Sequence, residues 1–177
     1  MGLRSVSIVA AGFVAIVGAA SAALQTRLAI SGAFHTTSAR AVTSSEEACG
    51  FRTEARTLIY QSEALRIGPG RAVARITFLI RHYRGPGRYD ARMPAPYGRT
   101  AVQVVTGRNA TTGVATGVYV ATSGSVSIVQ AKNVGLRRQS GSAGGAVRAR
   151  LRLQRGSKGL RLDGSWHCRI EPEANGS

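Results

Sequence analysis

The chain has 177 residues, about the length of one ordinary domain, and carries 24 Lys plus Arg against 8 Asp plus Glu, for a formal net charge of +16. A coiled coil, a multi-span membrane protein and a large multidomain enzyme are excluded, because there is no long charged heptad run and the only long uncharged stretch lies within the first 26 residues. Arginine supplies 22 of the basic residues, so the charge is permanent.

The first 22 residues have the layout of a signal peptide. Arg4 precedes an apolar run over residues 6–20, which ends in the small residues Ala20, Ser21 and Ala22. We therefore expect cleavage near Ala22 and a protein that is secreted or held at the cell surface. The alternative is an uncleaved anchor, which would make the membrane a partner, since the span from Arg4 to Arg27 could just cross a bilayer of about 30 Å.

The residues after the signal are predicted to be a disordered tether. Residues 36–47 are rich in Ser, Thr and Ala, a composition that buries little apolar surface. We therefore assign residues 23–48 to the tether, residues 49–171 to the folded domain and residues 172–177 to a disordered tail.

Two cysteines, Cys49 and Cys168, stand near the two ends of this domain. An even cysteine count in an exported chain predicts a disulfide bond, and the alternative is two separate buried thiols. A redox or metal role is not expected, because the sequence has no C-x-x-C motif and no second pair of ligands. No metal and no cofactor are predicted.

The first half of the domain reads as short strands separated by turns. Residues 73–83 alternate apolar and polar side chains, and the segment 84–88, which contains Gly-Pro-Gly, predicts a turn. Residues 58–67 predict an opening strand or strand pair. Three β-branched segments, at residues 100–106, 114–122 and 125–131, are bounded by glycines such as Gly107 and Gly124.

The last quarter carries the strongest alternation. Residues 147–154 and 160–170 each place Leu, Val, Trp or Cys on one face and polar residues on the other, and they predict a hairpin with Trp166 and Cys168 in the core. The Gly- and Ser-rich segment 133–146 predicts a flexible loop. Together these elements predict an all-β protein, a single antiparallel β-sandwich of about seven strands.

The polar face of the hairpin is the most unusual feature of the sequence. It is interrupted by only one acid, Asp163, and five arginines project from it: Arg148, Arg150, Arg152, Arg161 and Arg169. Guanidinium groups bind phosphate, sulfate and carboxylate in two-point contacts, so this face predicts an anion-binding surface. The alternative is that arginine is a compositional choice that keeps the sheet soluble.

Catalytic residues are sparse. The folded part contains two histidines, His82 at a strand end and His167 on the solvent face of the last strand, and two aspartates, Asp90 and Asp163. A small secreted hydrolase could combine one of each, but no spacing in the sequence supports a catalytic or metal site. We expect no enzyme activity and assign no catalytic residue.

Two short motifs carry a resemblance to known proteins. The turn Tyr-Arg-Gly-Pro-Gly-Arg-Tyr at residues 83–89 and the closing Gly-Ser-Trp-His-Cys at residues 164–168 resemble those of small exported bacterial β-sandwich proteins. The resemblance implies the fold and export, and it implies no activity.

The sequence thus predicts an exported, non-catalytic binding module for anionic cell-surface or extracellular polymers. The alternatives are a structural envelope protein whose partner is another protein, and the hydrolase. Nucleic acid is not expected as the natural partner, because an exported protein seldom meets it and base-stacking aromatic residues are few.

Overall fold

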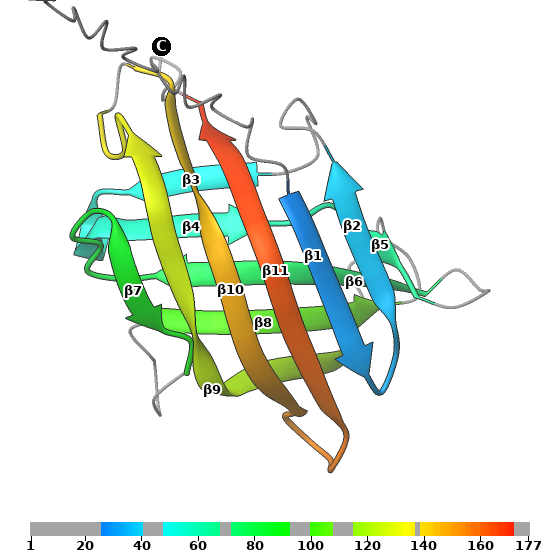
Figure 1. The fold of residues 1–177 in the computed structure, drawn as a ribbon. Helices are drawn as coiled ribbons and strands as arrows, with labels where there is room; N and C mark the ends of the chain where they lie inside the picture. Colours follow the sequence, from blue (N-terminus) through cyan, green and yellow to red (C-terminus); the bar gives the residue numbers. More distant parts are fainter. Residues whose placement is uncertain are drawn as a thin grey trace, which may run out of the picture.

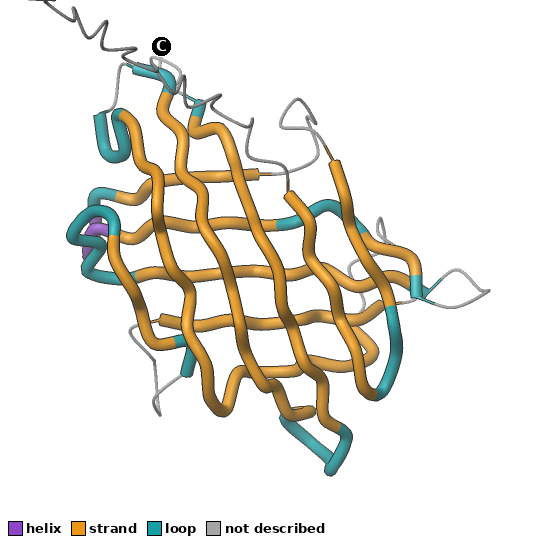
Figure 2. Tube along the Cα trace, in the orientation of Figure 1, coloured by secondary structure: helices purple, strands orange, loops and turns teal. Residues whose placement is uncertain are grey.

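The computed structural model describes residues 26–40, 48–67, 72–92, 100–107, 115–136 and 139–171. The described chain is all-β, as predicted, and its one helical element is the short 3-10 turn η1 (Glu54–Arg56) (Figure 2). No helix in the described segments is long and apolar enough to span a membrane. The predicted signal peptide, its cleavage site or anchor, and the predicted tail at 172–177 lie outside the described residues.

In the described residues, eleven strands form one hydrogen-bonded sheet. Their bounds are β1 (Thr26–Gly32), β2 (Thr36–Arg40), β3 (Ala48–Arg52), β4 (Thr57–Gln61), β5 (Leu65–Arg66), β6 (Val73–Ile80), β7 (Gly87–Asp90), β8 (Thr100–Gly107), β9 (Ala115–Lys132), β10 (Gly141–Leu153) and β11 (Gly159–Ile170). The order is β10-β9-β8-β6-β4-β3-β11-β1-β2, with β5 on β6 and β7 on β9. Because β10 also pairs with β11, the strands from β10 to β11 in this order close into a ring.

The sheet folds over itself, so that β9, β10, β11 and β1 cross β3, β4, β6 and β8 at a steep angle (Figure 1). The predicted sandwich had about seven strands, all antiparallel. Instead, the strands belong to a single sheet, and it is mixed, because β3 and β11 pair in parallel at Cys49 and Ile170. Alternation of side chains reveals which face of a strand is buried, but it does not reveal which strands pair or in which direction.

The core lies between these crossing strands. Trp166 is fully buried, as predicted, with its ring centroid 5.3 Å from that of Tyr60 and 5.6 Å from that of Phe78. Residues at every second position of β6 are buried, and the same holds for β10 and β11 except at Leu153 and Gly164, which are partly buried. The predicted alternation is therefore confirmed in these segments.

The predicted disulfide is present. Cys49 in β3 and Cys168 in β11 are bonded, with their Cα atoms 5.6 Å apart, at the point where Cys49 also pairs with Ile170 of β11. The bond links positions 119 residues apart, for which a chain-entropy account gives roughly 4 to 5 kcal/mol of stabilisation.

The predicted tether is wrong over residues 26–40. These residues form a hairpin in which β1 pairs with β2 on one side and with β11 on the other. Leu28 and Ile30 are buried because they point into the core, while the alternate positions Arg27 and Ala29 on the other face of β1 are exposed. Residues 41–47 of the tether lie outside the described residues.

Two predictions based on glycine are also wrong. Residues 141–146 form the start of β10 instead of a loop, and a Cβ on Gly145 would collide with the carbonyl oxygen of Ser127 on β9. Gly124 does not separate two strands, because β9 runs through it without interruption, with a positive φ of 124° at this glycine. In both cases glycine permits close contact between strands rather than a chain reversal.

Candidate anion-binding face

The outer face of β10 and β11 presents the predicted arginines. Arg148, Arg150 and Arg152 alternate with buried residues along β10, and Arg161 and Arg169 do so along β11; all five side chains are exposed. Their common orientation follows from the two-residue period of a strand whose other face is buried.

The register brings four of the five together. Arg148 lies opposite Asp163, Arg150 opposite Arg161 and Arg152 opposite Gly159. We call Arg148, Arg150, Arg152 and Arg161 the arginine cluster. Arg169 stands eight residues beyond Arg161, about 27 Å along the strand, and is therefore separate from the cluster.

Asp163 neutralises only part of the cluster. Its Oδ2 lies 3.2 Å from Nε of Arg148 and 3.7 Å from Nη2 of Arg161, and all three side chains are substantially exposed. Ion pairs of this kind are weak in water. Among the described residues, Arg150 and Arg152 have no carboxylate partner, so their guanidinium groups are available to a ligand.

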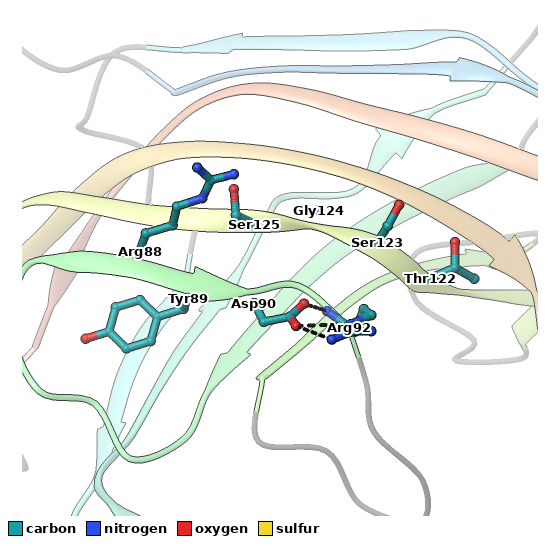
Figure 3. A pocket seen from close by; sticks show the side chains of 8 residues that line it. All are labelled: Arg88, Tyr89, Asp90, Arg92, Thr122, Ser123, Gly124 and Ser125. Carbon is teal, nitrogen blue, oxygen red and sulfur yellow. Dashed lines mark hydrogen bonds and ion pairs between the residues drawn. The ribbon is translucent and has the colours of Figure 1, made fainter.

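An open pocket of about 390 Å³ adjoins the cluster, between the end of β7 and the middle of β9 (Figure 3). It is lined by Arg88, Tyr89, Asp90 and Arg92 on one side and by Thr122, Ser123, Gly124 and Ser125 on the other. Through β9, the pocket is one strand away from β10 and its arginines.

A β-bulge in β9 shapes this pocket. The register with β10 shifts between Arg150 and Leu151, which pair with Ser123 and Ala121, so Thr122 is an extra residue. Ser123 and Ser125 share a side of the strand through its two-residue period, and the bulge turns the Thr122 hydroxyl to that side as well (Figure 3). Bulges often redirect side chains in this way near binding sites.

The hydroxyls differ in their partners. Thr122 Oγ1 donates a 3.2 Å hydrogen bond to the carbonyl oxygen of Arg150, and Ser127, further along β9, bonds to the backbone of Ala146. Within the described chain, the hydroxyls of Ser123 and Ser125 have no protein partner. They are therefore free to bond to a ligand in the pocket.

Asp90 and Arg92 form a fixed pair at the end of β7 (Figure 3). Asp90 Oδ1 accepts a 2.8 Å hydrogen bond from the backbone amide of Arg92, and Oδ2 accepts one of 3.0 Å from its Nε. The backbone bond, followed by the guanidinium bond, holds the pKa of Asp90 below its ordinary value, so the carboxylate is ionised at neutral pH.

Of the four residues considered for a hydrolase, Asp90 belongs to the pair with Arg92 just described, and the other three lie as follows. His82 is exposed in the turn after β6, with a positive φ of 53°. His167 was expected on the solvent face, but its side chain is half-buried and burial lowers its pKa. Asp163, held by the arginines, stands four residues from His167 on the same strand face, about 13 Å away and beyond hydrogen-bond reach.

Metal binding finds no support in the described part of the chain, which holds no group of three His, Cys, Asp or Glu side chains that could bind a metal ion. Comparison of the chain with protein-family models, with curated proteins and with solved structures found no match.

Sequence reasoning missed the pocket. Arg88 and Asp90 belong to β7, whose start overlaps the predicted turn, and the bulge at Thr122 leaves no mark in the alternation. The run of hydroxyl residues around Gly124 is the available signal, but the glycine within it predicts a strand boundary instead of a pocket.

Proposed function

We propose that this protein is an exported, non-catalytic binding module whose arginine cluster contacts anionic polymers of the cell surface or the extracellular space. The observation that carries the proposal is the pair Arg150 and Arg161, directly opposite each other on neighbouring strands. Like charges in this position destabilise a sheet, so their juxtaposition is best explained by an anion that lies between them.

The chemistry of the cluster supports a polymer more than a small ion. A guanidinium group makes two parallel hydrogen bonds to phosphate, sulfate or carboxylate. On an open sheet face each such contact is weak in water, but contacts with a polyanion add together because each releases counterions. We therefore expect steeply salt-dependent binding.

Export is part of the proposal. The Cys49–Cys168 bond is compatible with an oxidising compartment, where disulfides form and persist. The apolar run at residues 6–20 supports a signal peptide that is cleaved near Ala22.

The test is retention of the oxidised mature chain on immobilised phosphate polymers, sulfated glycan and DNA across a salt series. The variant R150Q/R152Q/R161Q should elute at markedly lower salt. The control R52Q/R66Q/R81Q removes three exposed arginines elsewhere and has the same net charge, and it should elute close to the wild type.

If the two variants elute together, the charge is compositional and the proposal fails. A structural protein with a protein partner would then be the better interpretation, and its complexes should survive high salt.

A further inference from the structure

The two free hydroxyls of the pocket lie directly opposite two arginines of the cluster. Ser125 lies opposite Arg148, and Ser123 lies opposite Arg150, with Cβ atoms about 5 Å apart across each pair. Each of these two cross-strand pairs, which we call rows, therefore offers one hydroxyl and one guanidinium. The rows follow each other every two residues, about 7 Å along the strands.

The pocket adds hydrogen-bond acceptors to these rows. Asp90 lies opposite Ser125 on β7, and its bonds to Arg92 leave lone pairs of the carboxylate unused. The Arg88 guanidinium lies on the same side as the Ser125 hydroxyl (Figure 3). This combination suits a ligand that carries both hydroxyl groups and negative charge.

We propose that the pocket is a subsite for the hydroxylated repeat unit of a phosphodiester polymer, which makes a polyol phosphate chain the ligand of the arginine cluster. This inference rests on the proposed function and specifies its ligand. Phosphates lie on Arg148 and Arg150, while hydroxyls of the polyol bond to Ser123, Ser125 and Asp90.

The dimensions of such a polymer fit the rows. Six bonds separate successive phosphorus atoms in a glycerol phosphate chain, and bonds of roughly 1.5 Å in a zigzag span about 7 Å. Each repeat carries one charge and one free hydroxyl, as each row offers one guanidinium and one hydroxyl. Inorganic polyphosphate has denser charge and no carbon-bound hydroxyl, and a sulfated glycan spaces its charges by whole sugar rings.

Two synthetic oligomers of equal length isolate the contribution of the hydroxyl. Oligo(glycerol phosphate) and oligo(propane-1,3-diol phosphate) have the same charge spacing and differ only in the hydroxyl of each repeat. We expect the oxidised mature chain to bind the glycerol oligomer about tenfold more tightly, as measured by fluorescence anisotropy at fixed salt.

The variant S123A/S125A should lose this preference and bind the propanediol oligomer as the wild type does. The matched control is S127A, which removes a hydroxyl of the same strand that is bonded to the backbone of Ala146. It should keep the tenfold preference, and thermal unfolding of each variant verifies that it is folded.

Equal affinity of the wild type for both oligomers, or a preference that survives S123A/S125A, would overturn the subsite. If R150Q/R152Q/R161Q still weakens binding to both oligomers in that case, the arginine cluster remains the binding face. If that variant binds both oligomers as the wild type does, the proposed function fails as well.

Discussion

Replacing Arg150 with Gln is expected to stabilise the fold slightly while it weakens polymer binding. Arg150 faces Arg161 across the β10–β11 ladder. Two such charges, taken as about 7 Å apart, repel by about 0.6 kcal/mol in water. Screening reduces this to about 0.3 kcal/mol at about 0.15 M salt and leaves about 0.5 kcal/mol at about 0.01 M. For a chain of this length, the melting temperature should rise by about 1 °C and 2 °C, respectively.

The assay is calorimetric unfolding of wild type, R150Q and the control R66Q at the two salt concentrations. Arg66 is exposed on β5 opposite the uncharged Val73, so R66Q should not show this gain. In binding, R150Q should reduce the slope of log affinity against log salt by about 0.7, the value for one lost phosphate contact to a flexible chain. An R150Q variant that is no more stable than R66Q at low salt, or that keeps the full slope, would refute the reasoning.

Three further predictions concern stability. Replacing Cys49 and Cys168 with Ser should lower the free energy of unfolding by about 4 kcal/mol in denaturant titrations. A wild type whose unfolding midpoint is the same with and without reductant would contradict this. Gly145→Ala should cost more than about 2 kcal/mol, since its Cβ would meet the Ser127 carbonyl; an unchanged melting temperature would count against the close approach of β9 and β10. Burial lowers the pKa of His167 below 6.5, so the unfolded chain binds the proton more readily and stability should fall as the pH drops below about 6.5; H167Q should flatten that pH profile.

The sequence predicted the strands that bury one face. The alternation in β6, β10 and β11 reports burial directly, and the structure buries Ile76, Leu151 and Trp166 as expected. Prediction from the sequence failed where a residue type is compatible with two kinds of structure. Gly145 looked like part of a loop because glycine favours turns, but glycine also permits two strands to approach closely.

The candidate site was predictable to a similar extent. The exposure of the arginines follows from the same alternation, but their grouping depends on register, which the sequence leaves open. The sequence therefore predicts that Arg169 belongs with Arg161, although eight residues along β11 separate the two side chains. The pocket depends on a bulge at Thr122 and on the pairing of β7 with β9, and both arise from contacts between distant segments.

The position of β11 in the sheet has a consequence for how the molecule is made. This last strand pairs with β1, β3 and β10, two of which come from the start of the chain. Folds dominated by such distant pairings form slowly, in milliseconds to seconds. The nascent polypeptide can neither complete this sheet nor form the Cys49–Cys168 bond until residues 159–170 have been synthesised.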